Sequence, residues 1–197
     1  MGARPKARFP AMVSGQGDRE GEDAMEMQGS RRIGAPRAVV WAALNDAEVL
    51  KAAIPGCQEL SGSPEDGFAA VVKQKVGPVS ATFHGKVTLA DVVPLTSYTI
   101  SGEGKGGAAG FAKGGAAVGL ADDGEGTLLT YDVKASVGGK LAQLGSRLID
   151  GFAKKMADSF FENFQAAVEP APEPVAAEAE AEGEKKPGWF RRMIGKT

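Results

Sequence analysis

The 197-residue sequence predicts an α+β fold in which a curved antiparallel sheet wraps around one long C-terminal helix. Residues 140–168 predict the helix, because this stretch has no proline and its apolar residues recur every three or four positions. Between residues 58 and 137, strand-like segments alternate with turns, and no long helix interrupts them. A long apolar helix stripe needs one continuous partner surface, which a curved sheet supplies.

The N-terminal part predicts one strand and two short helices. Residues 1–24 are rich in Gly, Arg and acidic residues without periodicity, so they are interpreted as a disordered extension. Met25 offers a natural start for the folded part, which leaves open whether residues 1–24 belong to the natural protein. A strand is expected at 26–33, followed by a helix after Pro36 that turns Val40, Leu44 and Trp41 inward. Asp46 is expected to cap a second helix over 47–53.

The middle of the chain predicts a run of antiparallel strands. Apolar and polar residues alternate cleanly over 79–92 and 127–137, which is typical of strands with one buried and one wet face. Asp122-Asp123-Gly124 is a hairpin turn signal. The strands are expected at 58–62, 68–76, 79–92, 97–101, 108–120 and 127–137.

The long helix predicted over 140–168 would direct one apolar stripe at the sheet. Gly145 and Gly151 each weaken a helix by up to about 1 kcal/mol relative to alanine, and they indicate either close packing or room for a ligand. The stripe comprises Leu141, Leu144, Leu148, Phe152, Met156, Phe160 and Phe164.

Two compositional segments follow the helix. Residues 169–184 form a linker of Pro, Ala and Glu in which every charge is negative, so the linker is expected to be extended. Residues 185–197 are basic, with apolar side chains that would share one helical face, as in an interfacial membrane anchor. A disordered basic tail and a helix that docks on a partner protein are the alternatives. The anchor residues would be Lys185, Lys186, Trp189, Phe190, Arg191, Arg192, Met193 and Ile194.

Composition excludes several classes of function. The net charge of −2 leaves the folded part nearly neutral, which argues against nucleic acid as a partner. The single cysteine, Cys57, excludes an intrachain disulfide and fits a reducing cytoplasm. With the single histidine, His84, on the polar face of its strand, no metal site is indicated. The glycines of 102–107 match G-x-G-x-x-G, but a strand rather than a helix follows them, so no dinucleotide site is expected.

The element order is similar to the helix-grip fold of START-like proteins, which leaves a cavity between sheet and helix. Several motifs follow one another in fixed order along residues 25–168. They are Leu44-Asn45-Asp46 with Val49-Leu50, Ile54-Pro55-Gly56-Cys57, Val76-Gly77-Pro78-Val79, Phe83-His84-Gly85-Lys86-Val87, the glycine run of 104–114, the segments 126–131 and 138–145, and Phe160-Phe161. With these motifs the chain resembles, within that superfamily, the G-subunit family of carbon monoxide dehydrogenase. The resemblance implies a non-catalytic accessory protein of a molybdenum-hydroxylase-type dehydrogenase at the cytoplasmic membrane, and the dehydrogenase need not oxidise carbon monoxide.

An internal cavity of this kind would be lined by aromatic and aliphatic side chains, although ordinary core packing explains the same residues equally well. A buried tyrosine needs a hydroxyl partner, which a polar ligand group could supply, and methionine adapts to varied shapes. The candidate lining residues are Phe83, Leu89, Tyr98, Tyr131, Leu148, Phe152 and Met156.

These features together predict an accessory protein that is not an enzyme and has no covalently bound cofactor. It would sit in the cytoplasm on the inner face of the membrane, recruit a molybdenum-containing dehydrogenase to an anionic lipid surface, and carry a lipophilic, quinone-like ligand. Two alternatives stay open at this point. The first is an assembly factor for the dehydrogenase, and the second is an enzyme acting on a hydrophobic substrate, since some helix-grip proteins are cyclases or aromatases.

Overall fold

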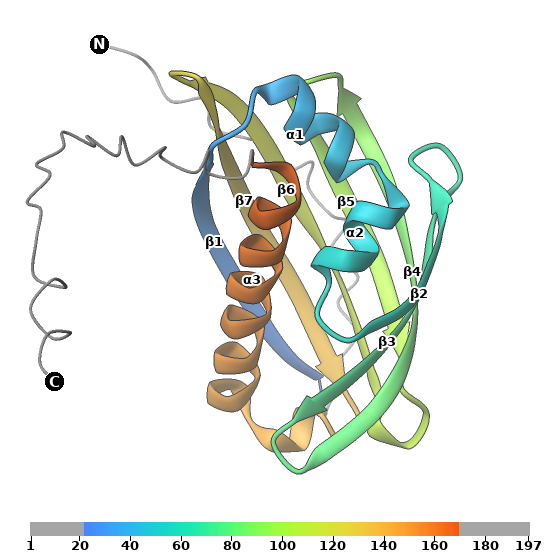
Figure 1. Ribbon diagram of the computed structural model, residues 1–197. Coiled ribbons are helices and arrows are strands. Elements are labelled where there is room, and N and C mark those ends of the chain that lie inside the picture. The colour runs from blue at the N-terminus through green and yellow to red at the C-terminus, as the bar shows by residue number, and fades with distance from the viewer. Residues whose placement is uncertain (1–21, 170–197) are drawn as a thin grey trace, which may run out of the picture.

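The computed structural model describes residues 22–169, which form a curved seven-stranded antiparallel sheet and three α-helices (Figure 1). The strand order is β1-β7-β6-β5-β4-β3-β2, so β1 and β2 are the two edges of the sheet. This arrangement confirms the predicted α+β helix-grip fold class. The elements are β1 (Glu22–Ile33), α1 (Arg37–Leu44), α2 (Ala47–Ala53), β2 (Cys57–Ser63), β3 (Gly67–Val76), β4 (Val79–Val93), β5 (Ser97–Lys105), the 3-10 helix η1 (Gly107–Ala109), β6 (Phe111–Asp123), β7 (Gly126–Gly138), the 3-10 helix η2 (Ala142–Leu144) and α3 (Ser146–Val168).

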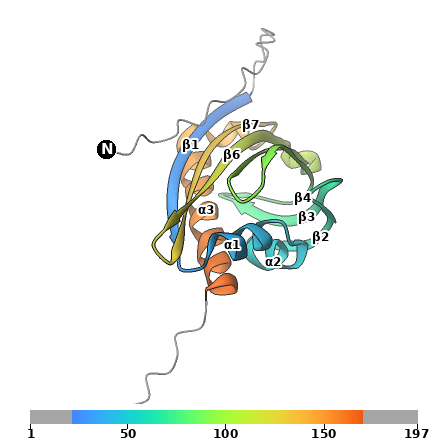
Figure 2. The same cartoon turned by 90° about the horizontal axis from the view of Figure 1, so that it is seen from above.

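The three α-helices lie on the concave side of the sheet. Figure 2 shows the strands curling around an interior that α3, α1 and α2 close on one side. Helix α3 packs along β1, while α2 contacts both α3 and β2. The opening between the two edge strands is therefore spanned by α2 and α3 side by side.

The buried residues form two clusters along α3. The larger one surrounds Phe164 in the last turns of α3 and includes Ile33, Val40 and Leu129. The smaller one lies near the start of α3 and comprises Val76, Val137, Leu141 and Ile149. The space between α3 and the sheet is thus filled most tightly at the C-terminal end of α3.

Helix α3 begins at Ser146, six residues later than the predicted start at Lys140. Gly145 has a backbone φ of 82°, which a right-handed helix cannot contain, and the residues before it form η2. The shorter helix is also rotated relative to the prediction, because Leu148 is 38% exposed whereas Ile149 is only 5% exposed. The predicted stripe is correct from Phe152 onward and wrong at Leu148.

Several other bounds differ from the sequence prediction. Strand β1 begins at Glu22, so residues 22–24, assigned by composition to a disordered extension, belong to the sheet. Strand β5 continues to Lys105, and the residues expected to start the next strand at Ala108 instead form η1. The cap on α2 is confirmed, since the Asp46 carboxylate accepts hydrogen bonds from the backbone N–H groups of Glu48 (2.8 Å) and Val49 (3.1 Å).

The C-terminal end of α3 is tied to the junction between β1 and α1. The Glu169 carboxylate accepts hydrogen bonds from the backbone N–H of Gly34 (2.7 Å) and from the side-chain amide of Gln165 (2.9 Å). The same amide donates to the backbone carbonyl of Arg32 (3.1 Å). The bonds from Gly34 and Gln165 lower the pKa of Glu169. Glu169, the first residue of the predicted linker, is therefore bound to the folded domain.

Candidate functional site

A pocket with a volume of about 480 Å³ lies between α3 and the concave face of the sheet. Its walls come from β1, the α2–β2 connection, β3, β4, β6, β7 and α3, so residues far apart in the sequence meet there. Apolar side chains make up almost all of the lining. The lining residues are Met25, Met27, Ile54, Pro55, Gln74, Val76, Phe83, Ala112, Tyr131, Val133, Ala135, Val137, Leu141, Ile149, Phe152, Ala153, Met156, Ala157, Phe160 and Phe161.

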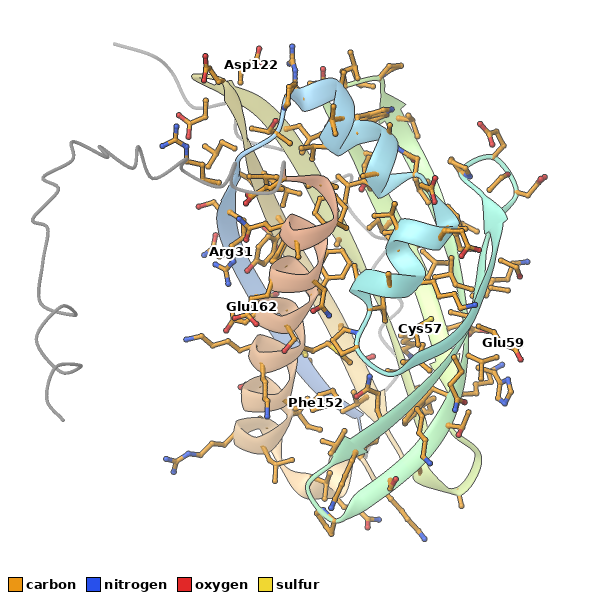
Figure 3. The ribbon with its side chains drawn as sticks, viewed as in Figure 1. Arg31, Cys57, Glu59, Asp122, Phe152 and Glu162 are labelled. Atoms are coloured by element: carbon orange, nitrogen blue, oxygen red, sulfur yellow. The ribbon has the colours of Figure 1, made fainter. Side chains whose placement is uncertain are left out.

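The structure brings part of the predicted lining together. Phe83, Tyr131, Phe152 and Met156 all line the pocket, and Figure 3 shows Phe152 on α3 on the side that faces the strands. Their placement in one pocket makes them neighbours, while ligand binding by them stays a prediction.

The remaining predicted residues, Leu89, Tyr98 and Leu148, lie outside the pocket lining. Leu89 is half-buried on β4. Tyr98 is 4% exposed and packs edge-on against Trp41, with ring centroids 5.6 Å apart, and burial raises the pKa of its hydroxyl. Leu148 lies on the exposed side of α3, so the rotation of the helix removes it from the wall.

Tyr131 is held between α3 and the edge strand β1. Its ring stacks on Phe161, with centroids 5.2 Å apart and an interplanar angle of 26°. Its hydroxyl end lies against Gly29 on β1, where a Cβ atom would overlap it, so a glycine is needed for this ring position. Within residues 22–169, the Tyr131 hydroxyl forms no hydrogen bond.

An ion pair ties β1 to α3 beside this stack. The Arg31 guanidinium pairs with the Asp158 carboxylate, and it also lies over the Phe161 ring at 5.4 Å from the centroid. Both charged side chains are partly exposed, so the pair adds little to stability. The pair holds the guanidinium over the outer side of the stack that Phe161 forms with Tyr131.

Gln74 is the polar side chain that sequence reasoning missed. It lies on β3 opposite Ala81 of β4, on the face that bears the pocket, and its amide nitrogen donates to the Pro55 carbonyl at 2.5 Å. The same nitrogen is 3.8 Å from the Met156 sulfur. The sequence signal that could have placed Gln74 is strand alternation, because it follows the inward-facing Val72 by two positions.

Titratable groups are scarce in the pocket lining, where Tyr131 contributes a phenol. The lining residues carry no carboxylate, imidazole, amine or thiol. His84 is exposed on the outer face of β4, as predicted, and Cys57 lies on β2, where burial raises the pKa of its thiol. Within residues 22–169, no group of three or more His, Cys, Asp or Glu side chains could hold a metal ion. In the same range, no helix is both long and apolar enough to cross a bilayer.

Two further predictions fall beyond the part of the chain that the structure describes. The linker after Glu169 lies there, and so does the whole basic peptide 185–197 with its anchor residues. The assignment of that peptide to a membrane surface therefore stays a prediction.

Comparisons with known proteins agree on fold and family. A conserved protein from Geobacillus kaustophilus has a solved structure that is 30% identical, with a TM-score of 0.69, and the match covers 73% of this chain and 95% of that chain. Two further solved structures share the fold. A protein from Rhizobium leguminosarum is 16% identical with a TM-score of 0.58, and the match covers 75% of this chain and 95% of that chain. A protein from Rhizobium loti is 18% identical with a TM-score of 0.56, and the match covers 75% of this chain and 99% of that chain. Among curated proteins, no match was found.

The family comparison covers most of the folded part. The model of the family described as the carbon monoxide dehydrogenase G subunit (CoxG) matches residues 29–169, which extend from the middle of β1 to the end of α3. The match includes all or part of every strand, both short helices, and nearly all of the pocket wall. The chain therefore belongs to the CoxG family, that of the carbon monoxide dehydrogenase G subunit.

Proposed function

We propose that this protein is a non-catalytic accessory protein of a carbon monoxide dehydrogenase-like molybdenum enzyme, and that its pocket takes up a lipophilic ring compound such as a quinone. Family membership supports the accessory role. The observation that supports a lipophilic ligand is the pocket itself, because the surface that its wall exposes is apolar.

The size and chemistry of the pocket suit such a ligand. A volume of about 480 Å³ falls within the range of roughly 300–1,000 Å³ that is usual for small-molecule sites. Transfer of an apolar ring from water into this space is favourable by about 25 cal/mol for each Å² of apolar surface buried. A quinone supplies such a ring, and the pocket lining offers the aromatic side chains of Phe83, Tyr131 and Phe152 as contacts for it.

The proposal extends to the membrane through the basic C-terminal peptide. Quinones are dissolved in the bilayer, so a carrier has to reach the lipid surface as well as the enzyme. Each Lys or Arg near an anionic surface contributes about 1 kcal/mol before screening, and Trp189 and Phe190 can enter the interface. The acidic linker would then let the domain move between the membrane and the dehydrogenase.

Electron transfer from the dehydrogenase to membrane quinone is expected to require the open pocket. The assay combines the dehydrogenase, its substrate and quinone-loaded anionic vesicles, and it measures quinone reduction with and without this protein. Ala153→Trp should fill the pocket and abolish the stimulation, because Ala153 lines it. Lys154→Trp adds the same side chain at an exposed neighbouring position and should retain the stimulation.

The outcomes of this assay distinguish a protein that carries quinone from one that only recruits the dehydrogenase to the membrane. Equal rates without the protein at saturating enzyme would exclude the carrier role. Full stimulation by the dehydrogenase fused to residues 185–197 alone would indicate that recruitment to the membrane is the whole function.

Deleting residues 188–197 is expected to release the protein from anionic vesicles without lowering its melting temperature. The buried core of the described residues lies between Ile33 and Phe164, so the deletion removes no residue of that core. The double change Trp189→Ala, Phe190→Ala should produce most of the same release. Sedimentation with vesicles and thermal unfolding are the measurements, and continued sedimentation of the truncated protein would place the anchor elsewhere.

A further inference from the structure

The turn between β4 and β5 presents a run of apolar side chains to solvent. Val92, Val93 and Leu95 are 49%, 51% and 39% exposed, and Pro94 between them is exposed as well. Within residues 22–169, three of the five large apolar side chains that are exposed lie in this one turn. Apolar residues scattered singly over a surface are normal, whereas a contiguous cluster is typical of a binding surface.

The backbone of this turn is strained. Asp91 and Leu95 have φ angles of 51° and 60°, and they are the only non-glycine residues with positive φ in the described part of the chain. Leucine adopts this conformation at a cost that glycine would avoid. Neighbouring groups hold the turn, since the Thr99 hydroxyl donates to the Asp91 carboxylate at 3.0 Å. The Leu120 N–H donates to the Thr96 carbonyl at 2.7 Å. Strain that the surrounding structure maintains is typical of functional surfaces.

The apolar turn lies at the end of the sheet where the last described residue is bound. In the antiparallel sheet, β4 ends and β5 begins at the same end at which β1 ends, beside α1 (Figure 1). Glu169 is bonded there to Gly34, just after β1. Four strand spacings of about 4.8 Å separate β1 from β4, so the turn and Glu169 are about 20 Å apart across the sheet. The chain that continues to the basic peptide 185–197 therefore starts close to the turn.

A lipid surface fits this turn better than a protein partner does. Three side chains at the tip of one hairpin offer far less than the roughly 800 Å² that each partner contributes to a stable protein interface. A bilayer makes no such demand, because each aliphatic side chain that enters the interface is stabilised individually. The one charged residue of the turn, Asp91, is acidic, so attraction to an anionic surface has to come from the basic peptide.

We propose that residues 92–95 form a second membrane contact, which enters the lipid interface beside the C-terminal anchor and turns this end of the domain towards the bilayer. The inference rests on the membrane attachment in the proposed function and adds where the folded domain meets the lipid. Two linked contacts reinforce each other, because binding of one raises the effective concentration of the other. Three aliphatic side chains alone bind weakly, so the basic peptide remains the anchor. None of the turn residues lines the pocket, so this contact is separate from ligand binding.

The triple change Val92→Ser, Val93→Ser, Leu95→Ser in the full-length protein tests the contact. It should weaken sedimentation with vesicles of phosphatidylcholine and phosphatidylglycerol by about ten- to thirtyfold, the value of burying the exposed parts of three aliphatic side chains. The ratio should persist at raised salt, because salt screens charges and not apolar burial. The matched control is Leu148→Ser, which should bind as the unmodified protein does. Leu148 is also exposed, at 38%, but it lies beside Gly77 in the β3–β4 turn, at the opposite end of the sheet.

A fluorescent label measures the contact directly. An environment-sensitive fluorophore on Val93→Cys, in a Cys57→Ser background, should shift its emission to the blue when vesicles are added, and nitroxide-bearing lipids should quench it. The same fluorophore on Leu148→Cys should show neither effect. This measurement does not depend on the folding of the triple variant.

Binding of the labelled protein without a change at the Val93 position would overturn the inference, as would equal binding by the triple variant. Shielding of the label only after addition of the dehydrogenase would identify a protein partner instead, and shielding only at raised protein concentration would identify a second copy of the chain. Either result would also overturn it. Failure of the unmodified protein to bind these vesicles would contradict the membrane attachment of the proposed function.

Discussion

Replacing Phe164 with alanine is expected to lower the free energy of unfolding by about 3–5 kcal/mol, the usual range for a fully buried phenylalanine. Phe164 is 0% exposed at the centre of the larger core cluster. Its ring stacks on Phe160 with centroids 5.8 Å apart, and Ile33 and Leu129 belong to the same cluster. The change removes this packing and leaves a cavity that the surrounding strands cannot fill. Urea unfolding followed by circular dichroism would measure the loss.

The matched control is Phe152→Ala, about three turns earlier on the same helix. Phe152 borders the pocket, so part of its ring already faces open space and truncation mainly enlarges an existing void. We expect a loss of about 1–2 kcal/mol, below the range for a closely packed phenylalanine. Equal losses for the two variants would mean that the structure near Phe152 is packed as closely as the core.

Replacing Gly110 with alanine is expected to lower the free energy of unfolding by about 2–6 kcal/mol, the sum of a conformational cost and a steric one. Gly110 joins η1 to β6 with φ 111° and ψ −147°, a conformation that is essentially restricted to glycine and costs other residues about 1–3 kcal/mol. A Cβ atom there would also overlap the Gly138 carbonyl on β7. Separating the two strands adds a penalty like that of overpacking, about 1–3 kcal/mol.

Gly107→Ala is the control for this prediction. Gly107 also has a positive φ, of 58°, but a Cβ atom there would meet nothing within 4 Å. It should therefore show only the cost of the left-handed conformation, about 1–2 kcal/mol. Thermal unfolding of both variants measures the difference, and similar melting temperatures would show that the contact with Gly138 does not matter.

The fold could be predicted because local signals agreed with the tertiary structure. The alternation over 79–92 matches the burial pattern of β4, in which Phe83 is half-buried and His84 is exposed. Asp46 stands where a cap was expected and forms the bonds of a cap. In both cases the structure is decided by residues that are only a few positions apart in the sequence.

The errors come from backbone geometry that apolar spacing does not report. The spacing from Leu141 through Leu144 to Leu148 continues the helical pattern, but Gly145 interrupts the helix and shifts its start. The side chain that then faces the sheet at this level is Ile149 rather than Leu148. A glycine with positive φ interrupts the helix and so changes which of the following side chains face the sheet, although the spacing of apolar residues in the sequence stays helical.

The candidate site was only partly predictable for a related reason. Phe83 and Tyr131 could be placed because alternation fixes which face of a strand they occupy. Gln74 could not, because its contacts with the Pro55 carbonyl and the Met156 sulfur join segments that are far apart in the sequence. Tyr98 lies outside the pocket lining, and its ring instead packs edge-on against Trp41 of α1, a contact that spacing along the chain does not reveal.

The hydrogen bonds around Glu169 have a mechanical consequence for a domain held by its C-terminal chain. A pull beyond Glu169 would be shared between the last turn of α3, which contains Gln165, and the backbone N–H of Gly34. The force would then pass into the junction of β1 and α1, and from there into the sheet through the ladder that β1 forms with β7. The bond between Glu169 and Gly34 would therefore oppose peeling of α3 from its C-terminal end.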